Sequence, residues 1–368
     1  MIWTACPDVP SKTWFSVASS ADGTKLAAVA YGGGIYTSTN SGLTWISNNV
    51  PNRNWISVAS SADGAKLVAV INVLSTSGAG GIYNSTNGGD SWTLTTAPGS
   101  LHSWSSVSCS TDGSKIVASG SQALTRQIHT SPDYGNTWNL TSAPNLSWYS
   151  VASSADGVKL VALAWQNNVI YTSTDSGLNW RPNAVPSNYW NTVSSSADGT
   201  KLIAGVDGGG IFISTNSGVT WTSNNAAPSR RWLSVASSAD GSKLAATSTG
   251  PIYTSSDSGS TWVSNDVPAL YWSSVATSAD GTRLVAVAAN GQIYTAQASP
   301  PLLSAAFSSG GLSITWSSGA TGFKLQRKVD LTTAVWTDVT NSVSTIGQLN
   351  QVIVTTTNGQ AFFRLQGQ

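Results

Sequence analysis

The sequence predicts an all-β protein: a seven-bladed β-propeller followed by a small β-sandwich-like domain. Three observations support this fold class. A tryptophan-led phrase recurs every 40 to 49 residues, each repeat contains four short β-type runs, and the last repeat is incomplete. Repeats of this length with four strands each are typical of propeller blades. We expect the propeller to span residues 1–300 and the second domain residues 301–368.

The repeat reads as four strands in order. The first resembles "WFSVASS" and ends in Asp-Gly, a pair that favours a tight hairpin turn because both positions need positive φ. The second resembles "KLAAVA", a glycine-rich loop follows, and the third resembles "GIYTS". A turn with the pattern Ser-x-Asn/Asp-x-Gly-x-x-Trp leads to the fourth. The first strands open with Trp14, Trp55, Trp104, Trp148, Trp190, Trp232 and Trp272.

The turn motif first stands at Ser38 to Trp45 and occurs in six copies at blade spacing. It resembles the Asp-box (BNR) repeats of sialidases, sortilin-type receptors and xyloglucanases, and the resemblance covers residues 1 to about 300. It implies that the acidic position caps the turn through backbone N–H groups and that the tryptophan packs beneath it. Because Asn replaces Asp in half of the copies, we expect a hydrogen-bond acceptor rather than a proton donor. These positions are Asn40, Asn87, Asp133, Asp175, Asn216 and Asp257.

The seventh repeat predicts how the propeller closes. It runs from Trp272 to Thr295 and then loses the turn motif in residues 296–300. Trp3 lies 11 residues before Trp14, much as Trp45 lies 10 residues before Trp55. We therefore expect residues 2–8 to supply the outer strand of the last blade, which leaves no open edge at the closure.

Residues 302–368 no longer follow the repeat and read as short strands such as "LSITWSS" and "FKLQRKV". The segment resembles the compact fibronectin-III-like modules that end many secreted bacterial proteins. An irregular β-sandwich for attachment to a cell surface is the alternative.

Composition narrows the possible partners. The net charge is +1 and 9% of residues are charged, so we predict neither nucleic-acid binding nor a polybasic membrane patch. No apolar stretch is long enough to span a bilayer, and no signal peptide is visible. The uncharged polar composition favours an extracellular or cell-surface protein, and we expect a monomer. Cys6 and Cys109 form no metal-ligand spacing or expected disulfide, and we predict no metal and no cofactor.

The loops divide between two ends of the blades. The Asp-Gly and Asp-box-type turns lie at one end, here called the hairpin end, and are nearly uniform. The second-to-third and fourth-to-first connections lie at the other, here called the variable end, where binding is expected. The seven strand-opening tryptophans would form a ring near the channel mouth and stack on sugars. The alternative is that they pack between blades.

Residues beside these tryptophans are further candidates for ligand binding. Arginines can bind anionic or hydroxylated ligands, although solvated loop charges are the alternative. The two longest second-to-third loops ("NVLSTSGAGG" and "GSQALTRQ") carry Arg126, with His129 just beyond, while His102 precedes the third repeat. The remaining predicted binding residues are Arg53, Arg230, Arg231, Tyr189, Tyr271 and Asp207.

The carboxylates favour binding over catalysis. The chain has no Glu, and most propeller aspartates belong to the hairpin and Asp-box-type turns. Asp8, Asp90, Asp207 and Asp266 remain, and they form no convincing pair for glycoside hydrolysis. The sialidase apparatus, which needs a Tyr–Glu pair, does not carry over. We therefore predict a secreted, lectin-like propeller with several sites for glycans or polysaccharide. A polysaccharide-active hydrolase or lyase centred on Asp207 and a purely structural or adhesive propeller are the alternatives.

Overall fold

The computed structural model divides into two compact units, Met1–Gln297 and Ala298–Gln368. It describes residues 1–73, 80–98, 103–122, 125–164, 168–298, 302–308, 311–317, 323–330, 335–347, 349–355 and 361–367.

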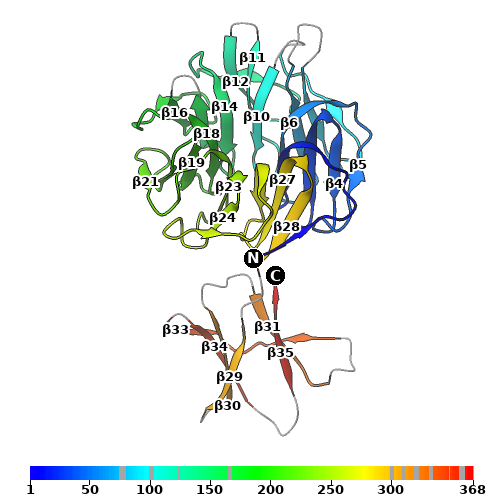
Figure 1. Cartoon of the computed structure of the whole chain (residues 1–368), viewed down its shortest axis with the longest axis vertical. Coiled ribbons are helices and arrows are strands. Elements are labelled where there is room, and N and C mark those ends of the chain that lie inside the picture. The colour runs from blue at the N-terminus through cyan, green and yellow to red at the C-terminus, as the bar shows by residue number, and fades with distance from the viewer. Residues whose placement is uncertain are drawn as a thin grey trace. The chain divides into compact units, whose positions relative to one another are not determined.

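The first unit is a β-propeller assembled from four-stranded antiparallel sheets (Figure 1). Within each sheet, consecutive strands pair in the order of the sequence, so every sheet is a meander. The first four sheets are β2–β5 (Lys12–Ser19, Leu26–Gly33, Ile35–Ser38, Ile46–Ser47), β6–β9 (Arg53–Ser60, Leu67–Ile71, Ile82–Ser85, Thr93–Leu94), β10–β13 (Ser103–Cys109, Ile116–Gln122, Thr125–Ser131, Asn139–Leu140) and β14–β17 (Trp148–Ser153, Leu160–Ala164, Val169–Ser173, Arg181–Pro182).

The remaining sheets of the first unit repeat the same plan with one change at the end. They are β18–β21 (Trp190–Ser195, Leu202–Val206, Ile211–Ser214, Thr222–Asn224), β22–β25 (Trp232–Ser237, Leu244–Gly250, Ile252–Ser255, Val263–Ser264) and β26–β28 (Leu270–Thr277, Arg283–Gly291, Ile293–Gln297). The fourth strand of the last sheet is β1 (Ile2–Ala5), which pairs antiparallel with β28. Figure 1 shows the N-terminus beside β28, and this closure was predicted from the sequence.

The core of the propeller lies between adjacent sheets. Trp14, for example, packs with Val17 of its own sheet and with Val285 and Ile293 of the preceding sheet. Each strand-opening tryptophan also meets an aromatic ring from the third strand of its own sheet, edge to face, with centroids 4.9–5.6 Å apart. Such pairs contribute about 0.5–1.5 kcal/mol beyond the burial of their surface.

A β-bulge interrupts every first strand just after its tryptophan. The register shifts between the tryptophan and the residue two positions on, as between Trp14 and Ser16. A bulge inserts one unpaired residue and so reverses the alternation of side chains. This is why Trp14 and Val17, three residues apart, pack in the same cluster. Ala18 packs instead in the next cluster, against Trp55.

The hairpin end is joined by two closed rings of contacts. Backbone N–H to C=O bonds of 2.7–2.8 Å run from sheet to sheet through Ala21, Ala62, Thr111, Ala155, Ala197, Ala239, Ala279 and back to Ala21. A basic side chain at the start of each second strand donates to the carbonyl of the next hairpin aspartate at 2.8–2.9 Å. These donors are Lys25, Lys66, Lys115, Lys159, Lys201, Lys243 and Arg283.

Hydrogen bonds hold the turns of the hairpin end in shape. In the Ser-x-Asn/Asp-x-Gly-x-x-Trp turn, the Thr44 N–H donates to Asn40 Oδ1 at 2.9 Å, and the Gly42 N–H donates to Ser38 Oγ at 3.0 Å. Gly42 has φ of 86°, a backbone conformation that favours glycine. Where aspartate occupies the acceptor position, as in Asp133, it accepts the equivalent bond. The geometry fits the expected role of an acceptor.

In the second unit, considered by itself, the described residues form two sheets. One has the order β29–β30–β34–β33 and the other β32–β31–β35. Its buried cluster includes Trp316, Leu325, Val352 and Leu365, which come from both sheets. The two sheets therefore share one buried cluster. The strands are β29 (Ser304–Ser308), β30 (Gly311–Ser317), β31 (Phe323–Lys328), β32 (Thr337–Asp338), β33 (Ser344–Ile346), β34 (Leu349–Val354) and β35 (Phe362–Gly367).

Candidate binding site

A cavity of about 740 Å³ lies among the first strands of the propeller. Its wall is made mainly of small and hydroxyl-bearing residues, and none of the described residues that line it is charged. Hydroxyl groups two positions after the tryptophans also join neighbouring sheets there. Ser16 Oγ, for example, accepts the N–H of Val58 at 3.2 Å. The cavity is therefore an uncharged channel whose wall carries many hydroxyl groups.

The seven strand-opening tryptophans do not line this channel. Trp14, Trp55, Trp104, Trp190, Trp232 and Trp272 are fully buried, and Trp148 is 3% exposed. Their rings fill the clusters between sheets because the bulge points the tryptophan away from the axis. The expectation that these tryptophans form a ring of exposed faces for stacking on sugars is therefore wrong. The side chains pack between blades, which was the alternative.

The residue immediately after each tryptophan lines the channel, together with residues that follow it along the strand. The residues directly after the tryptophans are Phe15, Ile56, Ser105, Tyr149, Asn191, Leu233 and Ser273, and all of them line the cavity. Phe15 and Tyr149 are substantially exposed. Phe15 also lies 6.0 Å from the Tyr31 ring, measured between centroids. Sequence reasoning missed this position, because strict alternation hides the extra residue of a bulge. The odd spacing in Trp-x-Ser-Val is the signal that reveals it.

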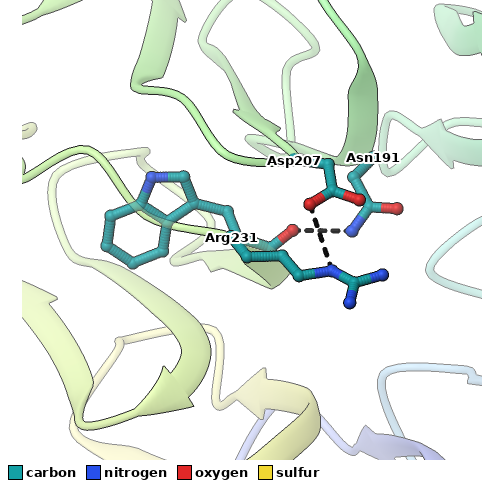
Figure 2. A network of polar contacts seen from close by, with 4 residues as sticks. Asn191, Asp207 and Arg231 are labelled. Carbon is teal, nitrogen blue, oxygen red and sulfur yellow. Dashed lines mark hydrogen bonds and ion pairs between the residues drawn. The ribbon is translucent and has the colours of Figure 1, made fainter.

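Two predicted site residues, Asp207 and Arg231, meet beside the channel. Neither lines the cavity as the structure describes it, but Asn191, which does, bonds to the carbonyl of Trp232 next to Arg231. Arg231 Nε lies 3.1 Å from Asp207 Oδ1, and the side chains are 53% and 30% exposed (Figure 2). Asp207 lies in the loop between β19 and β20, and Arg231 directly precedes β22 of the next sheet. The ion pair therefore bridges two neighbouring sheets at the variable end.

Two predicted tyrosines and one missed tyrosine lie near this ion pair. Tyr271 lines the cavity together with Tyr149, and both are about half exposed. Partial burial raises the pKa of Tyr149, with smaller contributions from Tyr271 and Asp207, while Arg231 acts in the opposite direction. Tyr149 is thus close enough to Tyr271, Asp207 and Arg231 for their charges to act on it. Tyr189 is exposed, and its carbonyl accepts the N–H of Asp207 at 2.8 Å.

The other predicted arginines occupy different positions. Arg230 lies over the Tyr253 ring at 5.4 Å and donates from Nε to Tyr253 Oη at 3.0 Å, so its side chain is held within its own sheet. Arg53 is exposed, and its backbone pairs with Gly33 of the preceding sheet. Neither residue lines the cavity as the structure describes it.

His129 is a core residue. It is 3% exposed and lies edge to face on Trp104, in the position that tyrosine or phenylalanine takes in the other sheets. His102, residues 74–79 and residues 123–124 lie outside the described residues, so the longest loops are described in part. Arg126, near the start of β12, is not among the described residues that line the cavity.

The remaining carboxylates lie apart from the cavity wall. Asp8, Asp90 and Asp266 are exposed. The hairpin aspartates accept hydrogen bonds from their own turns, as when Ser110 Oγ donates to Asp112 at 2.6 Å. Within the described ranges, no three His, Cys or Asp side chains gather as metal ligands, and no helix is long and apolar enough to cross a membrane. Cys6 and Cys109 are free thiols.

Comparisons with known proteins identify the fold. No family model matches the sequence, and no curated protein matches it. The structure is similar to YCF48 from Cyanidioschyzon merolae, with a TM-score of 0.61, 17% identity, and coverage of 80% of this chain and 98% of that chain. It is also similar to YCF48 bound to D1 peptide, with a TM-score of 0.62, 18% identity, and coverage of 81% and 97%.

A third similar structure is the GH74 xyloglucanase from Xanthomonas campestris. The TM-score is 0.65 at 14% identity, and the match covers 86% of this chain but 59% of the enzyme. At these identities the likeness extends to the fold alone, which is a β-propeller.

Proposed function

We propose that this chain is a carbohydrate-binding, seven-bladed propeller of the Asp-box type that binds its ligand at the channel mouth. The observation that carries the proposal is the group of exposed aromatic side chains around an uncharged, hydroxyl-rich cavity. Phe15, Tyr149 and Tyr271 line that cavity. Exposed aromatic rings stack on the apolar faces of sugars, and hydroxyl groups exchange hydrogen bonds with sugar hydroxyls.

The proposal differs from the sequence-based hypothesis in the number of sites. Repeated sites between blades required exposed tryptophan faces, and those faces are buried. The residues after the tryptophans differ from one sheet to the next, from phenylalanine to serine, so they make one asymmetric site around the axis. We propose a single central site per chain, in a protein that works outside the cell or at its surface, with a fibronectin-III-like second domain.

A glycan array followed by titration calorimetry tests this function. The Tyr149→Ala and Tyr271→Ala variants should fold and should bind the selected glycan about fivefold more weakly, because a stacked aromatic is worth about 1 kcal/mol. Leu178→Ala is the matched control, since Leu178 is exposed in a turn of the hairpin end. The absence of glycan binding, or equal affinity in all three variants, would reject the proposal.

The second candidate function is a polysaccharide-active enzyme. Asp207 is the carboxylate beside the channel, and a glycoside hydrolase is among the similar structures. Product release from a panel of polysaccharides that is abolished in Asp207→Asn would favour this function over binding alone.

A further inference from the structure

The Arg231 guanidinium is only partly engaged by its acidic partner. Its Nε atom forms an ion pair with Asp207 Oδ1 at 3.1 Å. Figure 2 shows the two terminal nitrogens of Arg231 directed away from Asp207. Among the described residues, no hydrogen bond to those two nitrogens is found, and just over half of the side chain is exposed. The outer edge of the guanidinium is therefore available to a ligand.

The ion pair is held in a fixed position by the backbone around it. The Asp207 N–H donates to the carbonyl of Tyr189 at 2.8 Å, and the Arg230 N–H donates to the carbonyl of Gly209 at 2.8 Å. The second of these bonds joins two neighbouring sheets. The neighbouring Arg230 donates its Nε hydrogen to Tyr253 Oη. Of the two adjacent arginines, Arg231 is therefore the one that can bind a ligand. Preorganised donors of this kind lose little entropy when they bind.

Polar and aromatic groups surround the available edge. Asn191, the residue after Trp190, is largely buried, and its Nδ2 donates to the Trp232 carbonyl at 2.6 Å (Figure 2). This bond fixes the backbone next to Arg231. Tyr149 lies within electrostatic range of both Arg231 and Tyr271, and the two tyrosines line the same cavity. A ligand at the mouth would meet one cationic edge beside two phenol rings.

The two ends of the propeller also differ in charge. The variable end carries five basic and three acidic side chains, whereas the hairpin end carries eight basic and eleven acidic side chains. The variable end is therefore net positive and the hairpin end net negative, which favours an anion at the mouth. The charged residues of the variable end are Lys12, Arg53, Arg126, Arg230, Arg231, Asp8, Asp207 and Asp266.

We propose that the glycan bound at the mouth is acidic, and that the carboxylate of a uronic acid residue accepts two hydrogen bonds from the terminal nitrogens of Arg231. Guanidinium and carboxylate groups match in this two-bond geometry. The sugar ring packs against Tyr149 and Tyr271. This inference rests on the proposed carbohydrate-binding function and names the class of glycan.

Titration calorimetry with three defined oligosaccharides tests the inference. Tetragalacturonate should bind at least about tenfold more tightly than its methyl ester, because hydrogen bonds to a charged group are worth about 1.5–3 kcal/mol. The ester keeps the same backbone without the charge, and cellotetraose serves as a neutral sugar of a different type. The preference for the acid should also weaken as salt is raised.

Variants of the protein then assign the preference to one residue. Arg231→Met should make tetragalacturonate and its ester bind alike, and Arg231→Lys should retain only part of the preference because an ammonium cannot form the two-bond fork. Arg181→Met is the matched control. It removes the same charge from an exposed position at the hairpin end and should leave the preference unchanged. Circular dichroism and melting temperatures confirm folding.

The outcomes separate this inference from the function on which it rests. If neutral oligosaccharides bind as tightly as the acid, or if Arg231→Met retains the preference, the acidic-glycan inference is overturned and carbohydrate binding stands. Equal or tighter binding of a sulfated oligosaccharide through Arg231 overturns the assignment to a carboxylate. If no glycan binds but peptides do, the proposed function fails and the inference fails with it.

Discussion

The two ends of the propeller use the same repeat in opposite ways. At the hairpin end, each sheet makes the same contact with its neighbour, and the backbone bonds return to Ala21 where they began. At the variable end, equivalent positions carry side chains as different as Tyr149, Asn191 and Ser273. The comparison teaches that one end supplies stability through repetition, which leaves the other end free to vary in chemistry.

The largest expected effect comes from a residue of the core that both ends share. Trp232 is fully buried and contacts Tyr253 edge to face. Trp232→Ala should lower the free energy of unfolding by about 3–5 kcal/mol, measured by denaturant titration. Tyr271→Ala at the mouth should cost less than about 1 kcal/mol, because its ring is half exposed. Similar costs for the two variants would contradict the division between core and mouth.

Acid should weaken the hairpin end. Hydrogen bonds from Ser110 and Ser114 lower the pKa of Asp112 to about 2. Burial raises the pKa of Asp240, but hydrogen bonds from Ser238 and Ser242 outweigh it and lower the pKa to about 2. Since an unfolded aspartate has a pKa of about 3.9, the unfolded chain binds more protons as the pH falls through this range. The stabilisation is complete above about pH 5 and is lost towards pH 2.

Melting temperatures measured from pH 6 to pH 2 check this prediction. They should fall steeply below about pH 4, where the unfolded aspartates take up protons. The Asp112→Asn variant should melt lower at pH 6 but lose less on acidification, because it lacks one of the titrating groups. A melting temperature that stays level down to pH 2.5 would exclude a role for these carboxylates.

The basic ring of the hairpin end should contribute a smaller amount per residue. Lys201 Nζ donates to the Asp240 carbonyl of the next sheet at 2.8 Å. Lys201→Met keeps most of the aliphatic chain and should cost about 0.5–1.5 kcal/mol of unfolding free energy. Arg53→Met at the variable end should change the stability by about 0.5 kcal/mol or less, since Arg53 is exposed. Equal losses would mean that the ring adds nothing specific.

The smallest effect is expected at the bulge. Ser105 and Ser106 both line the channel, but Ser105 is the extra residue of the bulge, so Ser105→Phe should change stability by less than about 0.5 kcal/mol. Ser106 accepts the N–H of Val151 at 3.1 Å, and Ser106→Phe should destabilise the protein by more than about 1 kcal/mol. Thermal unfolding of both variants measures the difference, and tolerance of Phe at Ser106 would show that the bulge is placed wrongly.

The sequence predicted the large-scale features because they repeat. Trp14 and its equivalents set the period, and the broken motif after Thr295 pointed to the strand that closes the last sheet. It did not predict which side chains reach the channel, because a bulge shifts the register by one residue without changing composition. The pairing of Asp207 with Arg231 was also invisible, since it depends on how two loops from neighbouring sheets lie in space.

The pairing of β1 with β28 has a consequence for the order of folding. Ile2 lies opposite Gln297, so β1 bonds to a strand synthesised almost 300 residues later. The buried cluster around Trp14 likewise includes Val285 and Ile293, which lie far later in the sequence. Contacts between such distant segments form slowly, because a long loop must close before they contribute. The ring therefore cannot be closed by the pairing of β1 with β28 until the last sheet has been synthesised.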